Sequence, residues 1–379
     1  MTEFSVNSKD LKKALNITIL GINDKIESVT GISIFKILLG EVCLVYSTDN
    51  DKKALAALAI SGQCNPVVFG VNPKNLLSFL STTDKESLYL SYDPEKNTLI
   101  ISESEKSYIS LNCVDTSSFI SFEDDYSNAE KIASVNSDMF INGLKYILGY
   151  TTTDEKSKYS SIFIKDGIIY GANGSTHIGV FKNLDLEPIA KLVIRRQMVT
   201  AISSFITTLV KDNIMEVTIK ITDKSVYFCS PDELYGFGYK LSTIEPPTLP
   251  INTEFPECSG YRIDKKVLIK KLTRLALTSK DEIGIKVTAT GGSLNLETIS
   301  ERKSADEIPY ITKIGDPESE FIIECNRFKK LLGLFDDSKI DLYSEDKYFI
   351  LYSEADYLIN DKVTKRFKQV GTIYRAKIV

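Results

Sequence analysis

Residues 321–335 read FIIECNRFKKLLGLF, an apolar run that passes through a polar junction into a basic amphipathic segment. The same order occurs at 67–80, VVFGVNPKNLLSFL, and at 192–206, LVIRRQMVTAISSFI. A short apolar run, a polar junction and then apolar residues at three- and four-residue intervals predict a strand followed by a helix. Successive copies are spaced by 125 and 129 residues, which indicates an internal repeat.

A second strand–helix pattern interleaves with the first. It occurs at 4–15, FSVNSKDLKKAL, at 133–144, ASVNSDMFINGL, and at 261–272, YRIDKKVLIKKL, with spacings of 129 and 128 residues. The chain of 379 residues therefore contains six strand–helix units, two in each of three blocks.

An alternating strand, a turn and another strand follow each predicted helix. Such alternation, interrupted by Asp, Asn, Gly or Lys, is typical of antiparallel hairpins. The six segments are 32–49, 87–103, 160–174, 216–230, 283–299 and 339–354. We expect an α+β fold of three repeated domains, each with two helices side by side on antiparallel sheets that lie outside them.

Two polar stretches separate the blocks. Residues 121–130, SFEDDYSNAE, are acidic, and residues 243–256, TIEPPTLPINTEFP, contain four prolines. Proline-rich or polar stretches between repeating units indicate domain boundaries. We predict domains at 1–126, 127–252 and 253–379.

The sequence lacks the residues of common catalytic and metal sites. His177 is the only histidine, and the six cysteines form no CxxC pair. Neither GxGxxG nor GxxxxGK[ST] occurs. We interpret the acidic stretch TDNDKK at 48–53 as a strand-end turn, and Glu-Asp-Asp at 123–125 as solvated linker charge. We therefore predict no catalytic residue, no metal site and no cofactor.

Composition also limits the cellular location. No apolar run is long enough to span a membrane. The first residues, MTEFSVNSKDLKKAL, lack a basic segment followed by an apolar one, so we expect no signal peptide. The cysteines lie singly in apolar, strand-like surroundings, which predicts reduced, mostly buried thiols and a cytoplasmic protein.

Charge is divided unevenly along the chain. The net charge is −5, yet six windows around the predicted helices hold 17 Lys and Arg against three Asp. The windows are 8–20, 72–83, 136–149, 195–211, 264–280 and 326–335. A lysine-lined surface binds duplex DNA by releasing counterions and reads no sequence. Only eight of the 46 basic residues are Arg, which argues against base-specific contacts.

With these features the full chain resembles the sliding clamps of the bacterial DNA polymerase III beta-subunit family. The resemblance rests on the repeat period, the six strand–helix units and local likenesses such as FSVNSKDLKKALNIT at the N-terminus. It implies three similar domains per subunit and two subunits closed into a ring, with helices inside around duplex DNA and sheets outside.

The resemblance also implies candidate DNA-binding residues, which we place by position rather than by identity. Most lie on the predicted helices, and Lys25, Lys156 and Lys158 lie in loops that approach DNA in the family. Lys12 and Lys13 are adjacent on one helix and cannot point the same way. The helix candidates are Lys9, Lys12, Lys13, Arg195, Arg196, Lys270, Lys271, Arg274, Arg327 and Lys330.

A second local likeness concerns the family's pocket for partner peptides. The family has an ATDGHR-like loop in its second domain, and this chain has GANGSTHIGV at 171–180, where Asn173 replaces the Asp and no Arg follows the glycine. A plain strand–turn–strand corner with Asn-Gly in the turn explains the same residues. The candidate pocket residues are Ala172, Asn173, Gly174, His177, Ile178, Leu249, Ile378 and Val379. The C-terminal TIYRAKIV departs from the family's apolar tail, which suggests a diverged, phage-encoded clamp, and the Lys-, Ile- and Asn-rich composition fits an AT-rich genome.

The resemblance implies a non-catalytic processivity factor whose partners are double-stranded DNA, a DNA polymerase, a clamp loader and a second copy of the chain. Free strand edges of the first and third domains would close the ring, and 348–355, YFILYSEA, is a candidate edge. The three-block count favours a dimer over a trimer. The alternative is a β-rich repeat-fold enzyme or structural phage protein that acts on nucleic acid, and a metal-dependent nuclease assay would separate the two.

Overall fold

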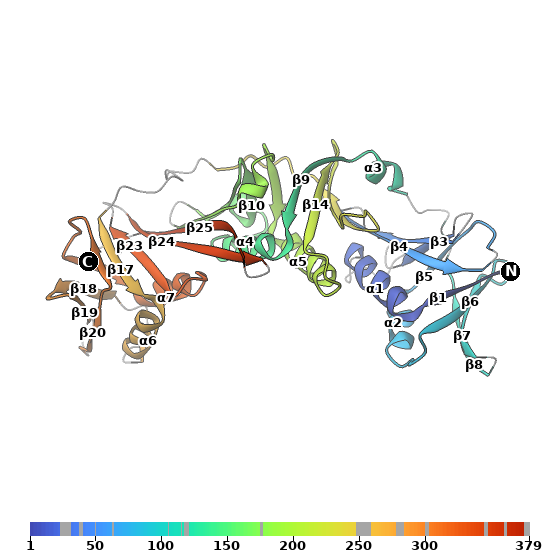
Figure 1. The fold of residues 1–379 in the computed structure, drawn as a ribbon, viewed down its shortest axis with the longest axis horizontal. Helices are drawn as coiled ribbons and strands as arrows, with labels where there is room; N and C mark the ends of the chain where they lie inside the picture. Colours follow the sequence, from blue (N-terminus) through green and yellow to red (C-terminus); the bar gives the residue numbers. More distant parts are fainter. Residues whose placement is uncertain are drawn as a thin grey trace. The chain divides into compact units, whose positions relative to one another are not determined.

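The computed structural model describes most of the chain. The described residues are 1–22, 32–37, 41–49, 51–62, 64–104, 106–114, 116, 121–174, 177–247, 259–277, 284–299, 303–344, 348–359 and 362–374. In these ranges, seven α-helices accompany antiparallel β-sheets (Figure 1). Short 3-10 turns within the same ranges are η1 (Ile19–Gly21), η3 (Lys158–Ser160) and η4 (Leu184–Leu186).

All six predicted strand–helix units are confirmed. In chain order they are β1–α1, β5–α2, β9–α4, β13–α5, β17–α6 and β22–α7. The helices are α1 (Ser8–Thr18), α2 (Pro73–Leu80), α3 (Glu123–Ser127), α4 (Ser137–Leu148), α5 (Arg196–Val210), α6 (Lys265–Ala276) and α7 (Cys325–Leu332).

The polar junction residues explain where four of these helices begin. Asn7, Asn72, Asp264 and Glu324 are extended N-cap residues, and each side chain accepts hydrogen bonds from backbone N–H groups of the first helical turn. The closest of these bonds measure 2.8–3.0 Å. A cap satisfies N–H groups that have no partner inside the helix, so it fixes the strand-to-helix transition at that residue.

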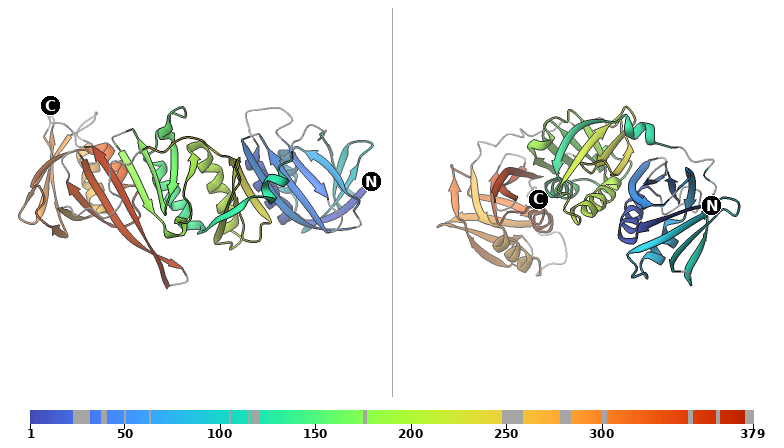
Figure 2. Two further views of the ribbon diagram at one scale, coloured as in Figure 1. Left: turned by 90° about the horizontal axis from the view of Figure 1, so that it is seen from above. Right: turned by 45° about the vertical axis from the view of Figure 1, so that its right-hand side comes forward.

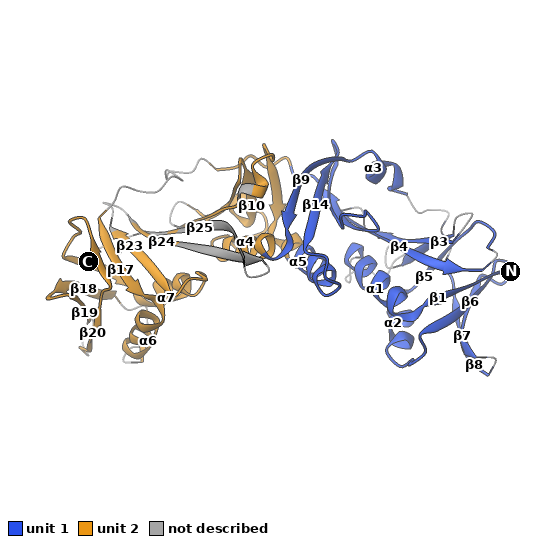
Figure 3. Ribbon diagram, viewed as in Figure 1, with its two compact units in different colours: residues 1–138, 200–242 blue, residues 139–199, 243–379 orange. Residues whose placement is uncertain are grey.

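The chain forms two compact units, and each is described by itself (Figure 3). Unit 1 comprises Met1–Asp138 and Thr200–Ser242, and unit 2 comprises Met139–Val199 and Thr243–Val379. The division runs through the second sequence repeat, so each unit contains one repeat and about half of another. Each unit therefore includes one place where successive repeats join.

Unit 1 is built on one 12-stranded antiparallel sheet. Its order is β8-β7-β6-β1-β4-β16-β15-β14-β9, with β3, β2 and β5 following on from β4. The strands are β1 (Thr2–Asn7), β2 (Ser33–Ile37), β3 (Val42–Thr48), β4 (Lys52–Ser61), β5 (Val67–Val71), β6 (Ser87–Asp93), β7 (Thr98–Ser104), β8 (Ser107–Asn112), β9 (Glu130–Asn136), β14 (Glu216–Ile221), β15 (Ser225–Cys229) and β16 (Tyr235–Lys240).

Unit 2 contains a nine-stranded sheet, β13-β10-β11-β12-β25-β24-β23-β17-β21, and a four-stranded sheet, β20-β19-β18-β22. The strands are β10 (Ser161–Lys165), β11 (Ile168–Asn173), β12 (His177–Lys182), β13 (Leu192–Arg195), β17 (Gly260–Asp264), β18 (Gly284–Thr290), β19 (Ser293–Ile299), β20 (Ala305–Pro309), β21 (Thr312–Ile314), β22 (Glu320–Glu324), β23 (Lys339–Ser344), β24 (Tyr348–Ile359) and β25 (Lys362–Tyr374).

All six predicted hairpins are present in these sheets. The prediction that 348–355 forms a free edge is wrong. That segment belongs to β24, which pairs with β23 on one side and with β25 on the other. Its alternation identified a strand, but only the tertiary pairing shows which strands flank it. The edges of the sheets include β8 in unit 1 and β20 in unit 2.

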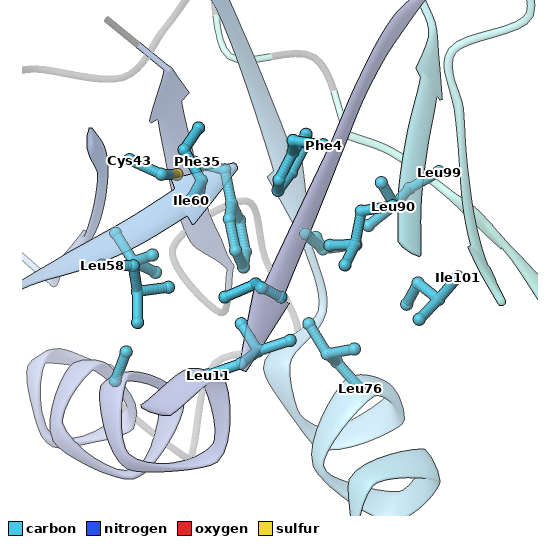
Figure 4. Packing of buried hydrophobic residues seen from close by; sticks show 14 of the residues in the cluster. Phe4, Leu11, Phe35, Cys43, Leu58, Ile60, Leu76, Leu90, Leu99 and Ile101 are labelled. Carbon is cyan, nitrogen blue, oxygen red and sulfur yellow. The ribbon is translucent and has the colours of Figure 1, made fainter. Parts of the chain in front are cut away.

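Paired helices cover the sheets. The helices α1 and α2 pack together in unit 1, and α6 and α7 pack together in unit 2 (Figures 1 and 2). Leu11 of α1 and Leu76 of α2 point into a core that includes Phe4, Phe35 and Leu90 from the strands (Figure 4). Burial of such side chains contributes roughly 1.5–3 kcal/mol each. This apolar contact holds the helix pair on the sheet.

We call the pairing of β4 with β16 the first joint, because it connects the first and second repeats within unit 1. Tyr235 lies opposite Ala56 and Phe237 opposite Ala54. Across this joint, Lys13 Nζ of α1 lies 2.5 Å from Asp212 Oδ2 and 3.8 Å from the ring centroid of Tyr235.

The helix α3, which lies between these repeats in the sequence, also stabilises the first joint. Asp125 of α3 lies 2.6 Å from Lys53 Nζ of β4 and accepts hydrogen bonds from Tyr227, Ser225 and Thr222 at 2.6–2.9 Å. The interpretation of 123–125 as solvated charge is therefore wrong for Asp125, and it is also wrong for Glu123, whose Oε2 lies 2.6 Å from Lys36 Nζ. The acidic sequence gave no sign of this, because the donors are distant along the chain and become neighbours only when the two repeats pair.

We call the pairing of β12 with β25 the second joint, because it connects the second and third repeats within unit 2. Gly179 and Gly371 lie directly opposite each other in this pairing. A Cβ atom on either glycine would overlap Tyr150, so both positions require glycine for close packing. Tyr150 is fully buried, and its hydroxyl lies 3.2 Å from the hydroxyl of Tyr146. The ring centroid of Tyr146 lies 5.4 Å from that of Phe335.

The predicted burial of cysteines is confirmed for four of the five described ones: Cys43, Cys113, Cys229 and Cys325 are buried and Cys64 is half-buried, all as free thiols. Cys258 lies outside the described residues. A turn at the described residues of 48–53 is also confirmed, since Asp49 accepts hydrogen bonds from the backbone N–H groups of Asp51 and Lys52, where β4 begins. No helix in the described ranges is long and apolar enough to cross a membrane.

Candidate nucleic-acid and partner-binding surfaces

The candidate cations of the first repeat lie on α1. Its apolar face is buried through Leu11 and Leu15, which leaves Lys9 and Lys12 exposed on other sides. Lys13 is engaged at the first joint with Asp212 and Tyr235. Burial lowers the pKa of Lys13, but the hydrogen bond to Asp212 and the nearby tyrosine outweigh it, so the pKa is raised and the ammonium stays charged.

Lys12 and Lys13 therefore do different things, as expected for adjacent helical positions. Lys12 is exposed to solvent, whereas the Lys13 side chain is only 16% exposed. Lys25 lies outside the described residues.

The second repeat places its candidate cations at the ends of secondary-structure elements. Lys156 and Lys158 are exposed just before β10, and Lys158 Nζ lies 5.3 Å from the ring centroid of Tyr159. Arg195 ends β13 and is half-buried. Arg196 donates hydrogen bonds to Leu148 O at 2.9 Å and to Thr151 Oγ1 at 2.6 Å. Its guanidinium thus neutralises the carbonyl end of α4.

The exposed side of α5 carries no cation. Gln197, Thr200, Ser204 and Thr207 are exposed along this helix at three- and four-residue intervals. The positive charge of the 195–211 window lies at its ends, at Arg195, Arg196 and Lys211. The exposed side of α5 therefore presents hydroxyl and amide groups, whereas α4 of the same repeat exposes Lys145.

The third repeat carries the densest group of candidates. On α6, Leu268, Leu272 and Leu275 are buried and Lys270 is exposed. Lys271 and Arg274 face β20, where Lys271 Nζ lies 2.6 Å from Asp306 Oδ1 and Arg274 Nη1 lies 3.5 Å from Asp306 Oδ2.

Asp306 is a counter-charge that sequence reasoning missed. Its side chain is 8% exposed. Burial raises the pKa of Asp306, but hydrogen bonds from Lys271 and a backbone N–H outweigh this and lower the pKa, so Asp306 remains a carboxylate. No local signal could have identified it, because it lies on another strand that meets α6 only in the folded chain.

On α7, Arg327 and Lys330 are exposed on the side opposite the buried Phe328 and Leu331. Arg327 Nε lies 3.9 Å from Glu324, the residue that caps the helix. A further exposed cation, Lys266 of α6, was not among the candidates. Its position four residues before Lys270 on the helix was the signal that could have identified it.

The candidate peptide pocket falls on the hairpin of β11 and β12. Ala172 lies opposite Ile178 and Asn173 opposite His177, and Gly174 follows with a φ of +65°. Ala172 and Ile178 are buried in a cluster with Tyr343, Ile350 and Tyr352. The backbone of His177 is described but its side chain is not, and Leu249, Ile378 and Val379 lie outside the described residues.

The strands on either side of 175–176 therefore pair as an antiparallel hairpin, with Asn173 at the end of β11. Beside it, Tyr159 and Ile244 are partly buried against the same apolar cluster. The cluster thus combines side chains from β11 and β12 with others from β23 and β24.

Solved structures with similar folds extend over the whole chain. A DNA polymerase sliding clamp from Bacillus subtilis matches with a TM-score of 0.78 at 14% identity, covering 100% of both chains. A DNA polymerase beta subunit from Streptococcus pyogenes matches with a TM-score of 0.78 at 15% identity, covering 99% of this chain and 100% of the other. A DNA polymerase III beta subunit from Thermotoga maritima matches with a TM-score of 0.76 at 13% identity, covering 100% of both. No protein-family profile and no curated protein sequence matches the chain. The predicted α+β fold of repeated clamp domains is confirmed.

Proposed function

We propose that this protein is a DNA sliding clamp, a non-catalytic processivity factor that encircles duplex DNA and tethers a replicative polymerase. The observation that carries the proposal is the full-length structural match to bacterial sliding clamps. Lysine-bearing helices add an independent argument, because they suit a duplex phosphate backbone without reading its sequence.

We propose three clamp domains at 1–126, 127–252 and 253–379, and a ring of two copies. The joints suggest how the ring closes. At each joint, the third strand after the helix of a repeat's first half pairs with the third strand after the helix of the next repeat's second half, as in β4–β16 and β12–β25. By the same rule, β20 of one copy would pair with β8 of the other. Both strands lie at the end of their sheets, and an unpaired strand edge is a ready template for another chain.

Exposed apolar side chains favour the same closure. Leu277 follows α6 and is 83% exposed. Counted from the residues that precede α4 and α6, Asn136 and Asp264, Leu277 corresponds to Gly149, which lies against Leu334 at the second joint. A second copy would therefore cover Leu277 as Leu334 covers Gly149.

The partners follow from this function. We propose double-stranded DNA inside the ring, a polymerase and a clamp loader outside it, and a cytoplasmic location. The β11–β12 hairpin with Ala172 and Ile178 is the proposed docking place for a partner peptide. The candidate cations on α1, α6 and α7 are the proposed DNA contacts, whereas Lys13 and Arg196 mainly hold the fold.

Trapping on DNA tests encirclement. The chain is incubated with linear duplex, the ends are ligated to make a circle, and the complex is washed in high salt. A clamp stays on the circle and is released when a restriction enzyme cuts it, because the link is topological rather than ionic. Equal loss from circular and linear DNA would refute the proposal.

Two further measurements describe the ring itself. Light scattering should give a mass near twice 42.4 kDa, and negative-stain images should show a hollow particle. A mass near three copies would contradict closure by two.

A further inference from the structure

A row of lysines crosses the second repeat on the sheet face that carries the proposed docking place. Lys165 of β10 lies opposite Ile168 of β11, and Ile168 lies opposite Lys182 of β12. Lys191 precedes β13 and continues the pairing of β10 with β13, which places it beside Lys165. Residues directly opposite each other in antiparallel strands share one face of the sheet. We call Lys165, Lys182 and Lys191 the lysine row.

The lysine row lies on the face of the sheet that is turned away from the helix α4. Ile168, in the middle of the row, is partly buried against the apolar cluster that contains Ala172 and Ile178. The opposite face meets α4, because a Cβ atom on Gly143 would overlap the side chain of Phe181. Ile168 and Ala172 are four residues apart on β11, which is about 13 Å along the strand. A ligand of the row therefore lies close to the proposed docking place.

The side chains of the row are exposed and weakly opposed. Those of Lys165 and Lys191 are 58% and 42% exposed, and Lys182 is also exposed. Lys191 Nζ lies 2.7 Å from Oε1 of Glu245, whose side chain is 82% exposed, and Lys165 Nζ lies 3.9 Å from Asp166. No carboxylate within the described ranges forms an ion pair with Lys182. Exposed ion pairs contribute little, so a carboxylate of a ligand can replace these internal partners.

Two acidic residues at the turn between β10 and β11 limit the positive surface. Asp166 and Gly167 have φ values of +48° and +80°, which suit the Asp-Gly sequence of a two-residue hairpin turn. Glu187 is exposed beside this turn, where a Cβ atom on Gly167 would touch its side chain. The turn geometry thus explains why an aspartate occupies position 166, whereas no such requirement explains the lysines.

Comparison with the first repeat shows that the fold does not require three lysines here. The matching row of the first repeat contains one lysine, which lies 129 residues before Lys165, and its other members are apolar. In strand order that row is Val68, Lys36, Leu44 and Ala57. Ala57 thus stands at the position of Lys182, and Val68 at that of Lys191. Like charges on neighbouring strands repel each other and lower stability, so the additional lysines indicate a ligand.

We infer that the lysine row binds acidic residues of the partner segment that docks on the β11–β12 hairpin. The inference rests on the proposed function, which supplies the docking segment, and it adds the chemistry of that segment. The segment has an apolar anchor for Ala172 and Ile178 and carboxylates about four residues away, since four extended residues span about 13 Å. The residues outside the helices are acidic on balance, so an acidic segment is attracted to the row and repelled by its surroundings.

Synthetic peptides test this chemistry. The probe is a fluorescein-labelled peptide with the apolar anchor Ile-Leu-Phe, the spacer Ser-Gly-Ser and three Asp residues, made in both chain orders. A second probe has Asn in place of each Asp. In its better order, the Asp probe should bind about tenfold more tightly than its Asn counterpart at low salt, because each exposed ion pair contributes roughly twofold. The advantage should shrink at about 0.5 M salt, where charges are screened.

The variant Lys165→Gln/Lys182→Gln/Lys191→Gln should abolish the advantage of the Asp probe and leave binding of the Asn probe unchanged. The inference is overturned if the unaltered chain binds both probes equally or binds neither. It is also overturned if the triple variant keeps the advantage.

A matched control removes three exposed lysines from other hairpin turns and loops, and it changes the net charge by the same amount. The control is Lys96→Gln/Lys224→Gln/Lys303→Gln. It should keep the advantage of the Asp probe. Loss of the advantage in this control would show that net charge, and not the lysine row, attracts the acidic probe.

Duplex DNA is a second anionic ligand against which the row is tested. Because the row faces away from α4, the variant that lacks it should lose no more duplex affinity than the matched control does. Anisotropy with a labelled duplex measures both. A larger loss in the row variant would assign the row to nucleic acid and overturn the inference.

The trapping assay on circular DNA separates this inference from the proposed function. If the chain is trapped on circles but binds the Asp and Asn probes equally, the inference fails and the clamp stands. If the chain prefers the Asp probe through the lysine row but circles retain no chain, the acidic-segment site stands and the encircling function fails.

Discussion

The first joint is held by charged and hydroxyl groups, whereas the second joint is held by tyrosines packed on glycines. At the first joint, Asp125 forms an ion pair with Lys53 and accepts hydrogen bonds from three hydroxyls, those of Tyr227, Ser225 and Thr222. At the second, Tyr150 fills the space that Gly179 and Gly371 leave open. The antiparallel strand pairing is the same, so backbone hydrogen bonds define the joint and side chains can stabilise it in different ways.

The division of the chain into two compact units also depends on the joints. Each unit surrounds a joint rather than a sequence repeat, and the division falls inside the second repeat. Repeats that share a continuous sheet bury side chains with their neighbour as well as within themselves. A duplicated sequence therefore need not give separately stable domains.

The largest effect is expected at the second joint. Gly371→Ala places a Cβ atom against the Tyr150 hydroxyl and should destabilise the chain by about 3 kcal/mol, the upper end for overpacking. Tyr150→Phe removes that hydroxyl and should recover part of the loss in the double variant. Urea unfolding measures both changes.

The control for this substitution is Gly284→Ala. A Cβ atom there would have its nearest neighbour at 3.4 Å, an ordinary contact, so little change is expected. Equal midpoints for Gly371→Ala and Gly284→Ala would show that the second joint is not tightly packed.

At the first joint, Asp125→Ala should cost about 2 kcal/mol, because it leaves Lys53 and three hydroxyls without their shared charged acceptor. The adjacent Asp124 is exposed, so Asp124→Ala provides a matched control and should be nearly neutral. Hydrogen exchange at β4 and β16 reports the local loss. Similar hydrogen exchange in Asp125→Ala and Asp124→Ala would show that Asp125 does not stabilise the first joint.

The joints should also differ in their response to acid. Burial raises the pKa of Asp125, but hydrogen bonds from Lys53, Tyr227 and Ser225 outweigh this and hold the pKa well below its usual range. A depressed pKa gives stability that is complete above the unfolded value of about 3.9 and is lost as pH falls toward the folded value.

The stability difference between the natural chain and Asp125→Asn should therefore be constant from about pH 5 to 8 and shrink below about pH 4. Burial raises the pKa of Tyr146 and Tyr150, so these tyrosines stay neutral over this range. A difference between the chain and Asp125→Asn that persists unchanged at low pH would show that charge is not what Asp125 contributes.

The smallest effect is expected from Lys13→Gln, about 0.5–1 kcal/mol for a partly exposed ion pair with a ring contact. The effect should decrease at high salt, because the Asp212 side chain is 46% exposed and screening reaches it. Lys12→Gln on the same helix is the control. A salt-independent loss would point to packing of the lysine stem rather than to its charge.

Sequence reasoning predicted the repeated elements well and the charged sites less well. The caps Asn7 and Asp264, and the alternation in each hairpin, are local signals and led to the right elements. Lys13 and Arg196 lie in basic helical windows of the sequence, as Lys270 does. Their partners, Asp212 and Leu148 O, are distant along the chain and are not visible in those windows. The sequence shows that a cation is present, but it does not show which acceptor or counter-charge the cation contacts.

The sequence by itself determined the three-fold repeat, the six strand–helix units and the positive bias of most helices, because periodicity and capping act over a few residues. Only the tertiary structure decided which strands join the repeats, which lysines are neutralised and where glycine is required. These three features depend on contacts between residues that are far apart in the chain. Such contacts form only when the sheets assemble, so no local sequence pattern predicts them.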